Sequence, residues 1–312
     1  MYIDRLIDEI KKKNNPSVIG LDPKIEYVPG YIKDSFFNEF GATFEGAAQA
    51  IIEFNTRLID AICDIVPAVK PQLAYYEMYG IEGIKAFDET VKYAKKKGLL
   101  VIADGKRNDI GSTAQAYSAA YLGNTPIEKE KHKAFDADAL TVNPYLGIDG
   151  IKPFIDDCAN NDKGIFVLVK TSNPSSGQLQ DLKTESGKAI YETVAEYVAE
   201  WGETVKGKYG YSSVGAVVGA TYPEQAKVLR EIMKNAYILV PGYGAQGGTA
   251  KDAAASFNKD GLGAIVNASR SVMCAYKSDK WNTKYDENSF AEAARAEAIR
   301  MRDEIVEAVN SL

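Results

Sequence analysis

Eight short apolar segments, spread along the whole chain, most strongly limit the folds that this sequence can adopt. Stretches with helical periodicity, such as "EGAAQAIIEFNTRLIDAICDIV", lie between most of them. Alternating strands and helices are typical of parallel α/β folds, and eight such units predict a closed (β/α)8 (TIM) barrel. A doubly wound open sheet is the alternative. The predicted strands are residues 17–22, 68–73, 99–105, 139–144, 164–170, 213–220, 237–242 and 264–269.

The chain is predicted to form one domain, residues 1–312, because no low-complexity linker divides it. A barrel of this type can take such a length as a single domain. Two connections are expected to be long loops. Residues 23–45 separate the first strand from its helix, and residues 111–138 follow the third strand. In a barrel, loops at this end of the strands extend the catalytic face.

Composition excludes several classes of function. The net charge of −6 is spread along the chain without a basic block, which argues against nucleic acid as a partner. The first fifteen residues predict neither a secretion signal nor a membrane span, and no apolar run approaches membrane length. Three cysteines, Cys63, Cys158 and Cys274, are far apart and lack CxxC spacing. We therefore expect a cytoplasmic protein with reduced thiols.

The chain has a single histidine, His132, in the polar stretch "KEKHKAF", where a solvated imidazole is expected. A Ser-His-Asp triad would have to use this residue, and HExxH zinc sites are excluded. Any acid–base chemistry must therefore be carried by Lys, Asp, Glu or Tyr.

Charged residues occur where the predicted strands end. In "ADGKRNDIGST", Asp104 and Lys106 are two residues apart, so an extended chain would point them to the same side, and Asp109 follows. Lys70 lies inside the apolar run "AVKPQL". A buried charge is costly unless it is paired, so each residue alone could belong to a core salt bridge or lie in water. Their convergence on one end of a barrel instead favours a catalytic cluster. Other strand ends carry Asp22, Asn143, Lys170 with Thr171, Gly242, and Ser269 with Arg270.

The last two β/α units have features of a phosphate site. The segment "VPGYGAQGG" holds four glycines, which allow backbone N–H groups to approach an anion closely. Arg270 in "NASRS" follows the eighth strand and could clamp a phosphate with two hydrogen bonds. Barrels often bind phosphate at these two loops. The polar segment 170–187 is either a flexible surface connection or a lid or rim over the ligand.

These motifs resemble those of the orotidine 5'-phosphate decarboxylase family. "DGKRNDIGST" is similar to its D-x-K-x-x-D-I motif. That motif alone is shared by a wider set of phosphate-binding barrels. The further matches "GLDP", "VKPQ", "NPYLG", "KTSNPSSG", "PGYGAQGG" and "NASRS" follow in the family's order and span residues 17–276. The length and "KRNDIG" resemble the longer bacterial-type branch, which usually has Gly where Asn108 stands.

The resemblance implies a homodimeric barrel that converts orotidine 5'-monophosphate to UMP and CO2, the last step of de novo pyrimidine nucleotide synthesis, with no metal and no organic cofactor. Lys106 would protonate pyrimidine C6, Asp104 would lie near the departing carboxylate, and Lys70 and Asp109 would complete an alternating charge network. Asp109 and Thr113 would reach into the neighbouring subunit's site. The implied substrate-binding residues are Asp22, Gln72, Thr113, Thr171, Ser172, Gln246 and Arg270.

Three other functions compete with this interpretation. One is a related barrel lyase acting on a sugar phosphate, with Asp104 and Asp109 near Mg²⁺. Another is a Schiff-base aldolase that uses Lys70 or Lys106, although a lysine flanked by acids should stay protonated. The third is a non-catalytic nucleotide-binding barrel, for which a buried alternating charge array would not be required.

Overall fold

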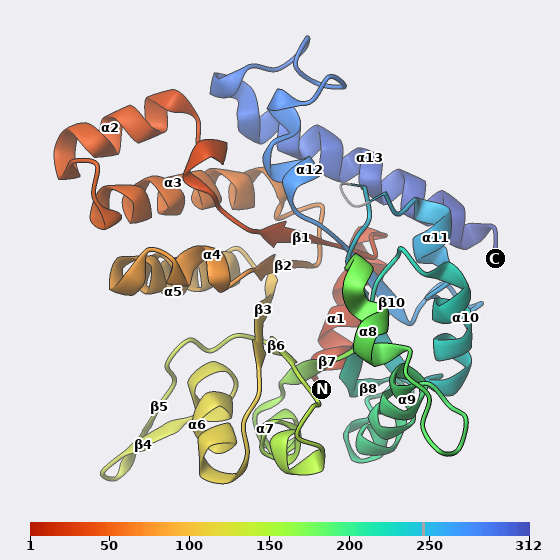
Figure 1. Cartoon of the computed structure of the whole chain (residues 1–312). Helices are drawn as coiled ribbons and strands as arrows, with labels where there is room; N and C mark the ends of the chain where they lie inside the picture. Colours follow the sequence, from red (N-terminus) through yellow and green to blue (C-terminus); the bar gives the residue numbers. More distant parts are fainter. Residues whose placement is uncertain (245–246) are drawn as a thin grey trace.

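The computed structural model describes residues 1–244 and 247–312, and it contains a closed barrel of eight parallel strands (Figure 1). The hydrogen-bonded order is β1-β10-β9-β8-β7-β6-β3-β2, and β1 also pairs with β2, which closes the sheet. The predicted (β/α)8 barrel is therefore confirmed, and the alternative of an open sheet is wrong. The barrel strands are β1 (Ser17–Leu21), β2 (Ala68–Pro71), β3 (Leu100–Arg107), β6 (Ala139–Val142), β7 (Gly164–Lys170), β8 (Ser212–Val218), β9 (Ala236–Val240) and β10 (Ala264–Ala268).

Most barrel strands are buried along their whole length, including β1, β8, β9 and β10. Helices cover the outside of a parallel barrel and side chains fill the inside, so both faces of each strand exclude water. This explains why the sequence shows continuous apolar runs. At the seam between β1 and β10 the packing requires a glycine. A Cβ on Gly20 would lie 1.9 Å from the Oγ of Ser269.

Helices surround the barrel, as Figure 1 shows. None of those in the described part of the chain is both long and apolar enough to cross a membrane. The α-helices are α1 (Tyr2–Lys13), α2 (Gly30–Phe40), α3 (Phe44–Ile62), α4 (Ala74–Glu77), α5 (Gly80–Lys96), α6 (Gly111–Tyr121), α7 (Lys152–Asn161), α8 (Gly177–Gln180), α9 (Ile190–Trp201), α10 (Pro223–Ile232), α11 (Ala250–Ala254), α12 (Arg270–Met273) and α13 (Phe290–Asn310). Short 3-10 helices are η1 (Ile25–Tyr27), η2 (Ile148–Gly150), η3 (Pro174–Ser176), η4 (Glu203–Val205), η5 (Ala275–Lys277) and η6 (Glu287–Ser289).

The two long connections contain regular structure. Residues 23–45 include η1 and α2, and α2 lies beside α3 (Figure 1). Residues 111–138 include α6 and a small hairpin formed by β4 (Thr125–Ile127) and β5 (Glu130–His132). The hairpin projects away from the barrel at the lower left of Figure 1, and its His132 is exposed, as the sequence predicts.

Helix α1 closes one end of the barrel. Its apolar side chains, including Leu6 and Ile7, are buried in one cluster with barrel residues such as Leu100 and Phe166. The rings of Tyr2 and Phe166 meet edge to face, with centroids 6.5 Å apart. Because α1 fills the end where the strands begin, the carboxyl ends of the strands form the open end.

Candidate active site

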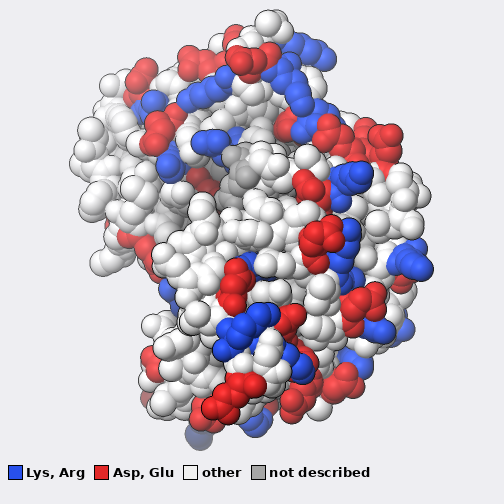
Figure 2. Space-filling view, turned by 45° about the vertical axis from the view of Figure 1, so that its right-hand side comes forward, with Lys and Arg blue, Asp and Glu red and all other residues white. Residues whose placement is uncertain are grey.

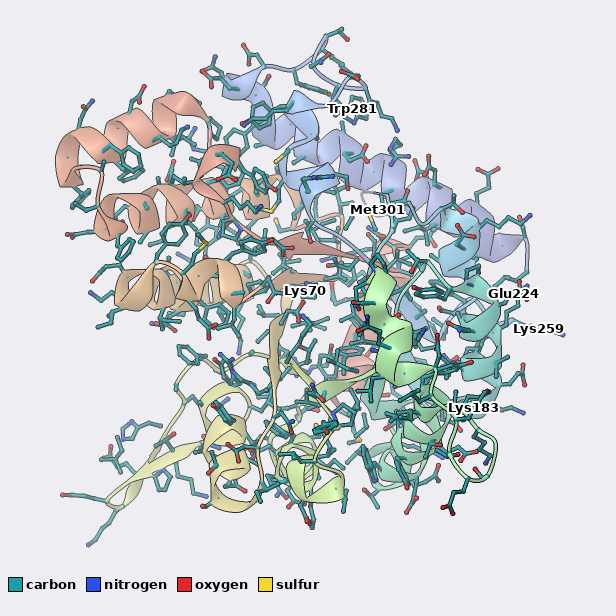
Figure 3. The ribbon with its side chains drawn as sticks, in the orientation of Figure 1. Lys70, Lys183, Glu224, Lys259, Trp281 and Met301 are labelled. Atoms are coloured by element: carbon teal, nitrogen blue, oxygen red, sulfur yellow. The ribbon has the colours of Figure 1, made fainter. Side chains whose placement is uncertain are left out.

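A cavity of about 660 Å³ opens at the carboxyl ends of the strands. Among the described residues, seven of the eight barrel strands contribute to its wall, and Asp22 contributes from the position directly after β1. Figure 3 shows the labelled Lys70 near the centre of the barrel, whereas Lys183, Glu224 and Lys259 lie at its periphery. Figure 2 shows a hollowed region with basic and acidic side chains around it. Eight of the predicted catalytic and substrate-binding residues line this cavity: Asp22, Lys70, Gln72, Asp104, Lys106, Thr171, Ser172 and Arg270.

The carboxylate of Asp104 lies at the centre of a hydrogen-bond network inside this cavity. Its Oδ2 accepts from Lys70 Nζ at 2.7 Å and from Gln72 Nε2 at 3.0 Å. Its Oδ1 accepts from Lys106 Nζ at 2.7 Å and from Thr141 Oγ1 at 2.8 Å. Four donors from three neighbouring strand ends therefore hold one carboxylate in a fixed orientation.

This network stabilises the charged forms of its members. Burial by itself would raise the pKa of Asp104, but Lys70 and Lys106 outweigh that effect and hold the pKa well below its usual range. Burial would likewise lower the pKa of Lys70, but Asp104 and Asp22 raise it above its ordinary value. The site therefore keeps a carboxylate and an ammonium ionised at neutral pH.

The side chains of the two lysines differ in solvent exposure. The side chain of Lys70 is 5% exposed, whereas that of Lys106 is 45% exposed. Lys106 also has a left-handed backbone with φ of +47°, and the register of β3 against β6 shifts between Ala103 and Arg107. The pairing of Asp104 with Lys106 thus occurs across a bulge in the strand. A non-glycine residue in this conformation is uncommon, and such strain clusters at functional sites.

Two oxygens in the cavity wall have no hydrogen-bond partner among the described residues. They are Asp22 Oδ1 and Asn267 Oδ1, and both are buried. Burial raises the pKa of Asp22, although Lys70 and the hydroxyl of Ser269 act in the opposite direction. Buried polar atoms are usually paired, so these two acceptors fit a ligand that brings hydroxyl or N–H donors.

One side of the cavity is formed by Thr171, Ser172 and Asn173, at the start of segment 170–187. Helix α8 supports this wall, because Gln180 accepts from the N–H of Thr171 and donates to its hydroxyl. The preceding residue, Lys170, is fully buried and pairs with Asp181 at 2.7 Å. The position of these first residues agrees with the interpretation of segment 170–187 as a rim over the ligand.

The predicted phosphate loop turns through glycines in left-handed conformations. Gly242, Gly244 and Gly247 have φ values of 96°, 72° and 91°, which side chains rarely adopt. Gly242 and Arg270 both line the cavity. Gln246, the other residue expected to hold phosphate, lies outside the described residues.

Two further predicted site residues lie outside this chain's own cavity. Asp109 follows β3, and its Oδ1 accepts from the N–H of Ile110 at 2.8 Å. Thr113 is exposed on α6. Neither residue lines the cavity.

Sequence reasoning missed several residues that line the cavity. Thr141 is buried in β6, where its hydroxyl also accepts from the N–H of Lys106 at 2.9 Å. Lys24, Tyr27 and Tyr75 enter the wall from the connections after β1 and β2. The sequence offers one signal for Thr141, a polar residue within an apolar run. This signal is weak, because threonine is common in strands whether or not it has a functional role.

Among the described residues, no three His, Cys, Asp or Glu side chains are grouped so that they could hold a metal ion. The strongest polar cluster of the cavity is instead the Lys/Asp network, whose carboxylate already accepts four hydrogen bonds.

Comparison with known proteins agrees with this geometry. Residues 18–280 match the model of the orotidine 5'-phosphate decarboxylase / HUMPS family. An orotidine 5'-phosphate decarboxylase of Caldicellulosiruptor saccharolyticus is 49% identical over 276 residues, covering 88% of this chain and 90% of that protein. One of Rhodopirellula baltica is 44% identical, covering 97% of this chain and 98% of that protein. The structure of Leishmania donovani OMP decarboxylase is 30% identical, with a TM-score of 0.71, covering 97% of this chain and 99% of that chain.

The chain therefore belongs to the orotidine 5'-phosphate decarboxylase / HUMPS family, and the resemblance seen in its motifs is confirmed. Its similarity to the named decarboxylases over nearly the whole chain makes it an enzyme of the carboxy-lyase class.

Proposed function

We propose that this protein converts orotidine 5'-monophosphate to UMP and CO2 in the cytoplasm, without a cofactor. The observation that carries the proposal is the Asp104 carboxylate fixed between Lys70 and Lys106 inside the cavity. Decarboxylation leaves an electron pair on an sp² ring carbon, which has little resonance stabilisation. A site for this reaction needs a fixed cation beside that carbon and a proton to give it.

Lys106 can supply both. When the bond between C6 and the carboxylate breaks, the electron pair stays on C6 and CO2 leaves. The ammonium of Lys106 stabilises this pair and then transfers a proton to C6, which leaves a neutral amine that is reprotonated from water. Its partner Asp104 keeps it oriented before the reaction, and electrostatic stabilisation is largest when charges are already in place.

Repulsion between Asp104 and the substrate carboxylate contributes less. Two like charges about 4 Å apart at an effective dielectric near 20 cost roughly 4 kcal/mol. Large enzymatic accelerations need on the order of 20 kcal/mol. We therefore assign the main effect to stabilisation of the carbanion by Lys106.

The remaining cavity residues have proposed binding roles. Asp22, Lys70 and Gln72 would bind the ribose side, and Thr171 and Ser172 the pyrimidine. Arg270 and Gln246 would hold the phosphate. Phosphate binding would supply energy, remote from the reacting carbon, that holds the substrate in a strained complex.

We also propose that the enzyme is a homodimer in which Asp109 and Thr113 act in the neighbouring subunit. Support comes from their position outside this chain's own cavity and from exposed apolar residues near them. Ile110 is 52% exposed and Leu146 is 44% exposed, and Leu146 lies beside Gly150, as does the carbonyl of Asp109. A cluster of exposed apolar side chains often marks a protein–protein contact.

The function is tested by following the ultraviolet absorbance of orotidine 5'-monophosphate after the protein is added in the presence of EDTA. We expect the orotate chromophore to disappear and UMP to form in equal amount. The Lys106→Ala variant should lose this activity and still bind UMP. If the wild-type protein leaves the chromophore unchanged in EDTA but becomes active with Mg²⁺, a metal-dependent lyase would replace this proposal.

A further inference from the structure

Lys24 is a cation of the cavity wall to which the family motifs assign no role. It follows β1 and lies between two aromatic rings, with its Nζ 5.7 Å from the ring centroids of both Tyr27 and Tyr75. All three side chains line the cavity. An ammonium at this distance from a ring face is attracted by the ring, so the two tyrosines stabilise Lys24 in the cavity wall.

The charges of the cavity do not balance without a ligand. The described part of this chain contributes four basic side chains to the wall, Lys24, Lys70, Lys106 and Arg270, but only two acidic ones, Asp22 and Asp104. Lys70 and Lys106 both pair with Asp104. Within residues 1–244 and 247–312, neither Lys24 nor Arg270 has a carboxylate partner, so both remain available to an anion.

These two cations lie on the same side of the cavity. Lys24 follows β1 and Arg270 follows β10, and these strands are paired in the barrel. Tyr27 lies close to both of them. Burial raises the pKa of its phenol, while Lys24 and Arg270 both act to lower it.

We propose that Lys24 is a second cationic contact for the substrate's phosphate, because the glycine-rich loop, Arg270 and Lys24 follow the three adjacent strands β9, β10 and β1. The inference rests on the proposed function and adds a specificity-determining residue to it. A phosphate monoester dianion would match the two cations that lack carboxylate partners. Tyr27 and Tyr75 are positioning residues, because they act on the ligand through Lys24.

The test compares the binding of UMP with that of uridine by calorimetry, since the two ligands differ only in the phosphate. For the Lys24→Met variant we expect UMP affinity to fall by roughly tenfold, the effect of one charged hydrogen bond, and uridine affinity to stay within about twofold. Lys24→Gln should resemble Lys24→Met, and Lys24→Arg should retain most of the UMP affinity.

Lys33→Met is the matched control, because Lys33 lies on α2 in the same connection and does not line the cavity. It should bind both ligands like the wild type. The inference is overturned if Lys24→Met and Lys24→Gln keep the wild-type preference for UMP, or if they lose affinity for UMP and uridine equally. If the wild-type protein itself does not prefer UMP, the proposed phosphate site fails as well.

Discussion

At the scale of single residues, Thr141 shows how one hydroxyl can organise the site. It donates to Asp104 Oδ1 and accepts from the N–H of Lys106. The second of these bonds secures the backbone of Lys106 in its left-handed conformation. Because strained conformations persist only where the surroundings hold them, Thr141 should be needed to orient the lysine ammonium.

The Thr141→Val variant tests this role, since it keeps the shape of the side chain and removes the hydroxyl. Losing these bonds should cost about 1–2 kcal/mol of transition-state stabilisation, or roughly tenfold in kcat. UMP affinity should change much less. Steady-state kinetics and calorimetry would measure both.

Thr141→Ser is the companion variant, because it retains the hydroxyl, and it should recover most of the activity. If Thr141→Val has the kcat of the wild type, the hydroxyl has no part in orienting Lys106.

At the scale of elements, the end of β3 differs from a simple strand. Alternation predicts that Asp104 and Lys106 point to the same side. In the structure the two side chains do meet, but across a bulge, with Lys106 in a left-handed conformation. The bulge depends on contacts with β6, which lies more than thirty residues further along the chain, so periodicity alone could not reveal it.

Helix α8 is the second element on which the cavity depends. Lys170 is fully buried, and its ammonium lies 4.7 Å from the ring centroid of Tyr222 and pairs with Asp181 just after α8.

The Asp181→Asn variant would leave this buried cation without a carboxylate. We expect this substitution to lower the free energy of unfolding by about 2 kcal/mol. This loss is smaller than that from breaking a fully buried ion pair, because Asp181 is 44% exposed.

Chemical denaturation would measure this loss, and hydrogen exchange should become faster in residues 171–181. Glu185→Gln removes the same charge from an exposed position of the same segment and should leave both unchanged. Equal stability of the two variants would mean that the ion pair does not anchor α8.

At the scale of the whole molecule, the arrangement of charges suggests an active site shared between subunits. Asp104, Lys70 and Lys106 occupy the cavity, while Asp109 from the same motif stays outside it. Because β3 ends at Arg107, Asp109 lies beyond the strand, whereas Asp104 and Lys106 belong to it. In the proposed homodimer, Asp109 of one subunit would complete the cavity that holds Asp104 and Lys106 of the other.

Mixing two inactive variants tests this arrangement. Lys106→Ala and Asp109→Ala homodimers should each be nearly inactive. A mixed dimer would contain one site with both residues intact, so random exchange of subunits should restore about a quarter of wild-type activity. Activity would be measured after the variants are unfolded and refolded together. No recovery, despite mixed dimers seen by native mass spectrometry, would show that Asp109 acts within its own subunit.

The order of the strands and the positions of the charges at their ends can be predicted from the amino-acid sequence alone. The pattern of apolar residues in a strand is a local property, so the eight strands could be predicted without knowing which strands pair. The sequence also indicates three functional charges, Lys70, Asp104 and Lys106. Each lies inside or directly after an apolar run, where burying a charge costs free energy unless the charge is paired.

Which side-chain atoms contact one another is seen only in the folded barrel. It joins Lys70 and Thr141 to the two oxygens of Asp104, brings Lys24 between two tyrosines beside Arg270, and leaves Asp109 outside the cavity. These contacts link side chains across different strands and their connections. They depend on barrel closure, strand register and a bulge, none of which leaves a periodic signal in the chain.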